Sequence, residues 1–300
     1  MLNPLQLAGW PAPVQGWLRH PSLRGVKNAI RHLQTGLDYA DFRRLNGLVA
    51  ALPLAPLLAY QPRFAYKYLS PYIAASFGRR ARLAALFHHY RFLAATGTAR
   101  FFHRLARQPV LWQERRGDDL LAVRLSYPLA AGFEAELSLS CYLNGVLAQV
   151  VSFVLVPGAL AGLPQEDSVL LFSQVQGVKN PALMKRATKA LHEITPAVLL
   201  VQAAYGLAEA LGIGRAAGIR STDQLSAGPA TYFDHDAFWG HLKGELSPDG
   251  RVYQLLIPTP EKPMALIAAN NRARHARKRA YKHQVRAQVA HAGRRLLGHA

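Results

Sequence analysis

The chain has 300 residues, of which 50% are hydrophobic, and its 36 Lys and Arg outnumber its 17 Asp and Glu to give a formal net charge of +19. This amount of apolar sequence can bury a substantial core, so one large or two small domains are expected. The charge predicts attraction to polyanions, although an arginine-rich composition that serves no ligand is the alternative. The single cysteine, Cys141, excludes an internal disulfide bond and is predicted to be a buried thiol.

Residues 1–118 are predicted to form helical segments that prolines interrupt. Val26–Tyr39 and Arg79–Ala95 carry apolar residues at intervals of three and four, the spacing of an amphipathic helix. The longest apolar run, Leu45–Tyr60, contains two prolines and is shorter than the ~20 residues that a membrane-spanning helix needs. No secretory signal pattern is evident at the N-terminus. We therefore expect a cytoplasmic protein, with peripheral contact at the inner membrane left open.

The period of the apolar residues then changes to two, which is typical of strands. The expected strands are Leu120–Tyr127, Glu134–Tyr142, Val146–Val156 and Ser168–Gln176. The dipeptide Asn144-Gly145 tolerates the positive φ angles of a tight hairpin turn, so the strands on either side of it should pair antiparallel. An antiparallel sheet of about four strands is the main structural prediction.

Helical spacing returns at Asn180. Asn180-Pro181 and Thr195-Pro196 each combine a capping residue with a proline at the first helical position. The second of these helices, Pro196–Leu211, is apolar nearly all round and should be buried against the sheet. The remaining expected elements are a short strand Ala216–Arg220, a helical turn Asp236–His241, a strand Val252–Ile257 and a long basic helix Ala265–Leu297.

These elements predict an α+β protein. A helical N-terminal region (residues 1–118) should pack beside an antiparallel or mixed sheet covered by helices (residues 119–263), and a basic helix (residues 264–300) should close the chain.

Several stretches in order along the chain resemble the VirK/YbjX family of Gram-negative bacteria. They are QPRFAYKYLSPYIAASFGRRARLAALFHHY (Gln61–Tyr90), TKALHEITP (Thr188–Pro196), LAEALGI (Leu207–Ile213), DAFW (Asp236–Trp239) and KRAYKHQ (Lys278–Gln284), with QG at Gln176-Gly177 and DG at Asp249-Gly250. The resemblance extends from about residue 20 to residue 286. It implies a role in virulence, envelope remodelling or stress adaptation, and it brings no settled biochemical activity.

The loop between the fourth strand and the first capped helix is a candidate phosphate site. Free N–H groups and the helix dipole at such a junction favour an anion. The order of antiparallel strands, loop, helix and strand also resembles GCN5-type N-acyltransferases, which hold the pyrophosphate of an acyl-CoA at this loop. Gln174 and Gly177 match their Q-x-x-G pattern, while Lys179 replaces a small residue. The predicted donor-binding residues are Gln174, Gln176, Gly177, Val178, Lys179 and Asn180, and a turn with a capped helix is the alternative.

The segment FDHDAFW (Phe233–Trp239) is the candidate for catalysis. An acid beside bulky aromatic residues can have its pKa raised by desolvation, which suits proton transfer. We therefore expect Asp236 or Tyr232 to assist proton movement, with Ser221 as a further catalytic candidate. Phe238, Trp239 and Asp223 are the expected pocket residues. Ordinary core packing of the aromatic side chains, with Asp236 as a cap, is the alternative.

The basic tail is the strongest binding candidate, because ten Lys and Arg and no acid follow Glu261. A cationic helix with a thin apolar stripe suits an anionic membrane surface or a phosphate backbone, although docking on the main domain is the alternative. The expected anion-binding residues are Arg272, Arg274, Arg277, Lys278, Arg279, Lys282 and Arg286.

Two functions from different classes follow. One is acyl transfer from an acyl-CoA donor within a VirK/YbjX-type protein, and the other is non-enzymatic binding of nucleic acid or anionic lipid. No metal site is predicted, because the adjacent His88 and His89 would point ~100° apart on a helix and there is no cysteine cluster.

Overall fold

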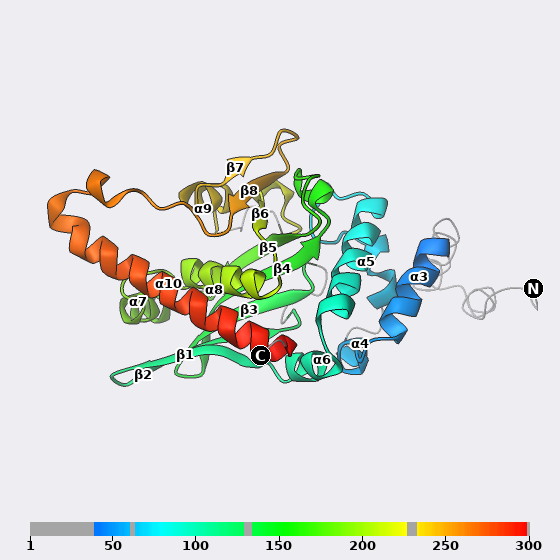
Figure 1. The fold of residues 1–300 in the computed structure, drawn as a ribbon, viewed down its shortest axis with the longest axis horizontal. Helices are drawn as coiled ribbons and strands as arrows, with labels where there is room; N and C mark the ends of the chain where they lie inside the picture. Colours follow the sequence, from blue (N-terminus) through cyan, green and yellow to red (C-terminus); the bar gives the residue numbers. More distant parts are fainter. Residues whose placement is uncertain (1–38, 61–63, 129–133, 227–232, 299–300) are drawn as a thin grey trace, which may run out of the picture.

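A computed structural model describes residues 39–60, 64–128, 134–226 and 233–298. The predicted helix Val26–Tyr39 therefore lies almost wholly outside the described residues, as does Tyr232. Within the described ranges the protein is α+β, as predicted. One mixed sheet lies beneath a layer of two long helices, and a helical N-terminal region packs beside it (Figure 1).

In the described residues, four α-helices and one 3₁₀ helix precede the sheet. They are α3 (Tyr39–Ala50), α4 (Ala55–Tyr60), the 3₁₀ helix η2 (Phe64–Leu69), α5 (Arg79–Thr96) and α6 (Ala99–Ala106). The predicted helix Arg79–Ala95 is confirmed within one residue at its end. Gly97 follows α5 and Thr98 caps α6 by accepting a hydrogen bond from the N–H of Phe101, so the chain turns sharply between the two helices.

The sheet has eight strands in the order β1-β2-β3-β4-β5-β6-β8-β7. All neighbours are antiparallel except β5 and β6, which are parallel. The strands are β1 (Val110–Arg116), β2 (Asp119–Ser126), β3 (Leu137–Leu143), β4 (Val146–Val156), β5 (Val169–Gly177), β6 (Arg215–Ile219), β7 (Glu245–Leu246) and β8 (Val252–Leu256). The predicted sheet is thus confirmed and enlarged. It begins earlier than predicted, because β1 lies within residues 1–118.

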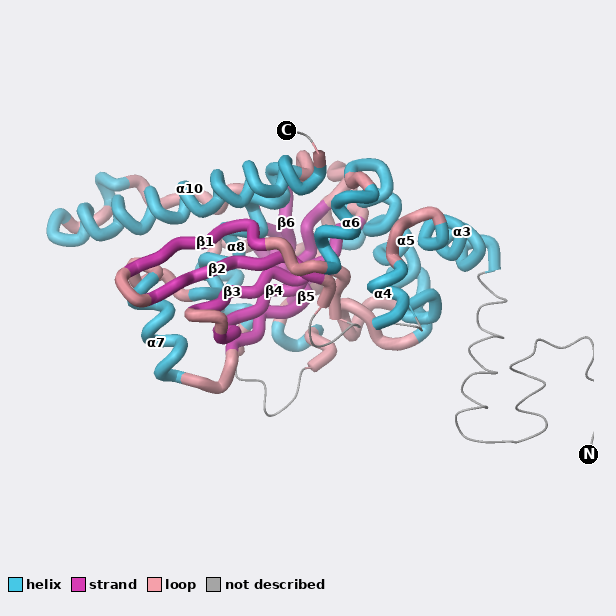
Figure 2. The backbone as a smooth tube through the Cα atoms, turned by 90° about the horizontal axis from the view of Figure 1, so that it is seen from below, coloured by secondary structure: helices cyan, strands magenta, loops and turns pink. Residues whose placement is uncertain are grey.

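Four α-helices follow β5 in the described residues, and the first two connect the parallel strands β5 and β6. They are α7 (Pro181–Ala190), α8 (Pro196–Ala210), α9 (His235–His241) and α10 (Ala269–Leu297). Asn180 and Thr195 cap α7 and α8 with their side chains, as predicted. Figure 2 shows α10 running along one side of the sheet, and its end returns to α6, where a side chain on Gly298 would lie 3.4 Å from Thr98.

Both faces of the central strands are buried. Leu137 pairs with Phe153 and Phe153 with Phe172, so these residues share one face, which α8 covers through Tyr205. Glu136 is one residue further back and faces the opposite side, where side chains of the N-terminal region reach it. The polar positions of the Glu134–Tyr142 pattern are therefore enclosed by the fold.

Candidate functional site where strands β5 and β6 part

The parallel strands β5 and β6 stay together only briefly. They pair at Leu170, Leu171 and Phe172, with Ala216, Ala217 and Gly218 as partners. Beyond Phe172, β5 continues to Gly177 paired with β4 alone. Ser173 is an extra residue in β5, because the register shifts between the Phe153–Phe172 and Ser152–Gln174 pairs. A bulge increases the local twist and bends the bulged strand, so the two parallel strands separate at this point.

The first turn of α9 lies between the separated strands. Asp234 caps α9, since its carboxylate accepts a hydrogen bond from the N–H of Ala237 at 2.9 Å. The Nε2 atom of His235 accepts a hydrogen bond from the N–H of Val175 in β5 at 3.4 Å. His235 is buried, and burial lowers its pKa to about 4, so the ring is neutral at pH 7 and can act as an acceptor. This histidine was not among the predicted site residues.

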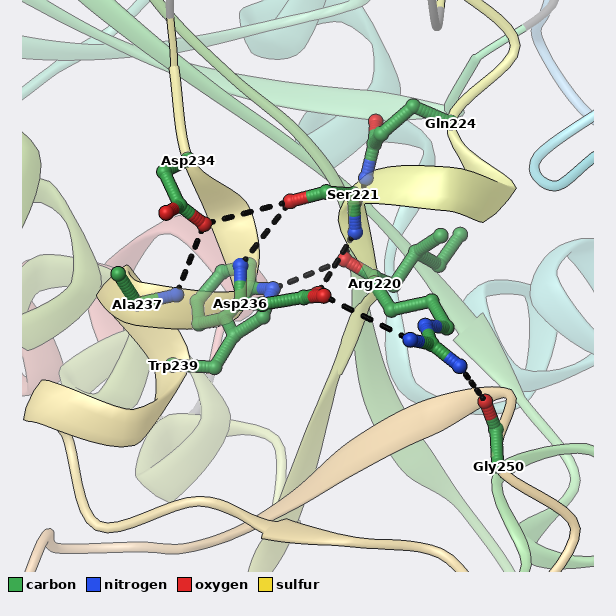
Figure 3. Close-up of polar contacts among 9 residues, drawn as sticks. Arg220, Ser221, Gln224, Asp234, Asp236, Ala237, Trp239 and Gly250 are labelled. Carbon is green, nitrogen blue, oxygen red and sulfur yellow. Dashed lines mark hydrogen bonds and ion pairs between the residues drawn. The ribbon is translucent and has the colours of Figure 1, made fainter.

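Two reciprocal hydrogen bonds join Asp236 in α9 to Ser221, which follows β6 (Figure 3). The Asp236 carboxylate accepts from the N–H of Ser221 at 2.8 Å, and the Ser221 hydroxyl accepts from the N–H of Asp236 at 3.1 Å. Arg220 adds an ion pair to Asp236 at 3.8 Å and donates to the carbonyl of Gly250 at 3.1 Å. The structure thus brings together two predicted catalytic residues, and the Asp236 side chain remains 29% exposed.

The aromatic residues of α9 form a wall. Trp239 is fully buried, stacks on Phe172 with ring centroids 5.4 Å apart and donates to the carbonyl of Ile219 at 2.9 Å. A side chain on Gly218 would lie 2.2 Å from the indole, so the ring rests directly on the backbone of β6. Phe238 is partly buried against Trp239. Two of the three expected pocket residues, Phe238 and Trp239, therefore pack against each other on α9, the helix that carries Asp236.

Asp223, the third expected pocket residue, contacts the N-terminal region. It is buried and its two carboxylate oxygens accept hydrogen bonds from the N–H and hydroxyl of Ser76, both at 2.6 Å. Its carbonyl also accepts from the N–H of Ala75. Asp223 therefore connects the segment after β6 to the N-terminal region.

The loop predicted to hold phosphate follows β5. The N–H of Val178 donates to Ala148, the N–H of Asn180 donates to Val178, and the Asn180 side chain caps Leu183. These N–H groups already have acceptors within the protein, so they are not free to bind a phosphate. A phosphate at this loop would need other donors. Gln176 and Gly177 are exposed, and beside Gly177 the buried Gln149 has an Nε2 atom with no hydrogen-bond partner in the described part of the chain.

Comparison with known proteins decides the family. A family model described as a protein of unknown function, DUF535, matches residues 24–291, which is most of the chain. The chain belongs to the DUF535 family. It is also similar to the uncharacterized protein YbjX of Escherichia coli (strain K12), with 25% identity over 237 residues that cover 74% of this chain and 69% of that protein. The resemblance to the VirK/YbjX family is confirmed. No solved structure matches the chain.

Residues of the segment Gln61–Tyr90 form a buried polar cluster with Glu136, on the face of the sheet opposite α8. Glu136 accepts hydrogen bonds from Tyr72 at 2.6 Å and Tyr90 at 2.5 Å, and it forms an ion pair with Lys67. Lys67, Tyr72 and Tyr90 all come from Gln61–Tyr90. Burial lowers the pKa of Lys67 and raises the pKa of both tyrosines. Sequence reasoning missed this cluster.

The segments Thr188–Pro196 and Lys278–Gln284, which also carry the family resemblance, meet at the turn between α7 and α8. His192 contacts Tyr281 of α10, with ring centroids 4.7 Å apart, and its Nδ1 lies 3.3 Å from a nitrogen of Arg116. The Tyr281 hydroxyl donates to Glu114 in β1 at 2.9 Å. These contacts fix the middle of the basic helix to the sheet.

Most of the predicted anion-binding cations have partners within the protein. Glu193 pairs with Arg274 and Lys278, Glu261 with Arg279 and Lys282, and Glu209 with Arg286. Arg272 donates to the carbonyl of Ile267, whereas Arg277 has no hydrogen bond or ion pair among the described residues. These cations of α10 are therefore largely engaged in ion pairs with other parts of the protein.

Two absences apply to the described residues. They contain no group of three His, Cys, Asp or Glu side chains arranged to hold a metal ion. None of their helices has the length and apolar character needed to cross a membrane.

Proposed function

We propose that this DUF535 protein transfers an acyl group from an acyl-CoA-type donor to a nitrogen acceptor. The observation that carries the proposal is the parting of the parallel strands β5 and β6 just after Phe172, next to the bulge at Ser173. This arrangement is similar to that of GCN5-type N-acyltransferases, in which antiparallel strands, a loop, a helix and a parallel strand follow in the same order. Fold alone does not establish function, so the chemistry is argued from the residues.

The donor arm would lie along the edge of β5 that β6 leaves uncovered. The amide-containing arm of an acyl-CoA can hydrogen-bond to an unpaired strand edge as an added strand does. It would replace the 3.4 Å contact between His235 and the N–H of Val175. Its phosphates would lie toward Gln176–Asn180, where Lys179 offers a positive charge and Gln149 offers an Nε2 donor that has no partner among the described residues.

The reaction would proceed by attack of the acceptor nitrogen on the thioester carbonyl. A C–N bond forms, the C–S bond breaks, and the sulfur leaves with the bonding electron pair. The proton released by the nitrogen passes to the carboxylate of Asp236, which is accessible at the mouth of the parted strands, and then through solvent to the thiolate. Ser221 and Arg220 hold that carboxylate in place. Tyr232 stays a candidate for the same proton transfer.

The family resemblance suggests the biological setting. We propose that the acyl transfer serves envelope or stress adaptation, including adaptation during virulence, at or near the inner membrane. Modification of a nitrogen on an envelope component would fit this setting, and a donor with a long acyl chain is therefore included in the test.

Calorimetric titration with acetyl-CoA and with a long-chain acyl-CoA tests the proposal. Charge reversal of Lys179 (K179E) should weaken donor binding about tenfold, whereas reversal of the exposed Lys185 on α7 (K185E) should change it by less than about threefold. Asp236→Asn keeps an acceptor for the N–H of Ser221 but removes the base. It should retain donor binding and lower turnover by about 100-fold. Absence of donor binding at millimolar concentration by the wild-type protein would refute the proposal.

A further inference from the structure

A second site lies at the opposite edge of the sheet, in a groove between α6, β1 and the last turns of α10. The groove has a volume of about 560 Å³, within the range of small-molecule sites. Its walls come from segments far apart in the chain, since α6 ends at Ala106 and α10 ends at Leu297.

The groove is lined by cations without acids. Arg104 and Arg107 enter it from the α6 side, and His291 and Arg295 enter it from α10. None of its lining residues is Asp or Glu. The side chains of these four residues make no hydrogen bond or ion pair within the described ranges, in contrast to the Glu-paired cations earlier in α10. Four cationic or titratable groups thus converge with no counter-charge from the described residues.

Compensation of helix dipoles accounts for only part of this set. Cations in the last turn of a helix offset its negative end. Arg104 and Arg295 lie in the last turns of α6 and α10, together with His103 and Arg294, so these two groove arginines also face the negative helix ends. His291 lies in the turn before the last one of α10, and Arg107 lies beyond the end of α6. The spacing of four residues places His291 and Arg295 on one side of α10, and both line the groove.

The base of the groove is apolar. Leu111, Trp112 and Leu296 line it and are buried, and Val110 beside them is 43% exposed. Gln113 and Gln288 add neutral donors at the rim. An arginine guanidinium binds the oxygens of a phosphate through paired N–H groups, and an apolar surface favours a ligand with an apolar part.

We propose that this groove binds a phosphate ester whose remaining part is apolar, with the phosphate between Arg104 and Arg295 and the apolar part over Trp112. The same chemistry is offered by a soluble phosphate ester and by the headgroup region of an anionic phospholipid. The proposal is independent of the acyl transfer, because four strands lie between β1 and β6 in the sheet.

The test uses the full chain and four probes. Calorimetry with phenyl phosphate and with inorganic phosphate examines the soluble source, and co-sedimentation with phosphatidylglycerol or phosphatidylcholine vesicles examines the lipid source. If the ligand is a soluble ester, we expect phenyl phosphate to bind more tightly than inorganic phosphate. If the ligand is a lipid, we expect the protein to bind phosphatidylglycerol vesicles but not phosphatidylcholine vesicles. In both cases binding should weaken as the salt concentration rises.

Variants assign the binding to the groove. The double charge reversal R104E/R295E should weaken binding at least about tenfold, and the milder R104Q/R295Q should weaken it in the same direction if the reversal impairs folding. The control is Arg80→Glu, because Arg80 is an exposed helical arginine on α5 outside the groove. Its effect should stay below about threefold. The proposal is overturned if no probe binds the wild-type protein, or if R80E weakens binding as much as the groove variants do.

Discussion

Lys67 and Glu136 form an ion pair in the interior of the protein, with side chains 2% and 0% exposed. Lys67 also donates to the carbonyl of Ala135 at 3.1 Å, and the carboxylate receives two further hydrogen bonds from Tyr72 and Tyr90. Because the lysine and tyrosines come from the N-terminal region and the glutamate precedes β3, the cluster holds these two parts of the protein together.

Removing either partner of this pair should destabilise the protein strongly. Lys67→Met leaves a buried carboxylate without its cation, and Glu136→Gln leaves a buried ammonium without its anion, so each should cost about 3–5 kcal/mol. The double variant should cost less than the sum of the two by at least about 1 kcal/mol. Urea denaturation measures all three. As a control, Arg44→Met removes an exposed pair with Asp41 and should cost less than about 1 kcal/mol. Strictly additive effects of the two buried substitutions would contradict a coupled pair.

The crossing of α8 and α10 depends on glycine. A side chain on Gly206 would lie 2.3 Å from the carbonyl oxygen of Arg286, so the helices approach closely there. Gly206→Ala should force them apart and lower stability by about 1–3 kcal/mol. The matched control is Gly47→Ala in α3, which meets nothing within 4 Å and should be neutral or stabilising by up to about 1 kcal/mol. Thermal unfolding of both variants checks this. Equal melting temperatures for Gly206→Ala and Gly47→Ala would show that the helices do not need a glycine at their crossing.

Acid should weaken the fold before most carboxylates titrate. Burial lowers the pKa of His88 and His235 to about 4, from 6.5 for a free histidine. Between these values the unfolded chain binds protons that the folded chain does not, so stability is full above pH 6.5 and falls as the pH drops toward 4. Urea midpoints measured from pH 7 to pH 4 should show this decline. His235→Gln should make it shallower, and a decline that is unchanged in that variant would exclude His235 as a contributor.

The position of the Trp239 ring depends on the absence of a side chain at Gly218. Gly218→Ala would place a methyl group within 2.2 Å of the Trp239 ring, which must then move away from Phe172. We expect a loss of about 1–3 kcal/mol of stability and a change in tryptophan fluorescence. The control is Gly240→Ala in α9, the helix that carries Trp239, because a methyl group there would have no atom within 4 Å. Unchanged fluorescence in Gly218→Ala would mean that the ring does not rest on β6.

Local sequence signals predicted much of the fold. The turn at Asn144-Gly145 has positive φ at both residues, and the strand after it has the bounds that its alternation predicts. The capping residues Asn180 and Thr195 mark the helices that they were expected to begin. Cys141 is buried as predicted, and burial raises its pKa to about 12.

The features that were missed depend on contacts between distant segments. The alternation of polar and apolar residues around Glu136 gives no sign that the polar face is also covered, because the cover comes from residues near Lys67. Strand β1 ends in Gln113, Glu114 and two arginines and lies at the sheet edge, so its apolar signal is short. Likewise, the cationic tail has no nearby acid in sequence to show that Glu193 and Glu209 would pair with it.

Hydrogen–deuterium exchange with and without acetyl-CoA tests the central claim most directly. If the donor lies along the edge of β5 beyond its pairing with β6, peptides that span Ser173–Asn180 should exchange more slowly with the donor present, and peptides from β1 and β2 should not change. Unchanged exchange across Ser173–Asn180 at a donor concentration that saturates binding would contradict the proposed site.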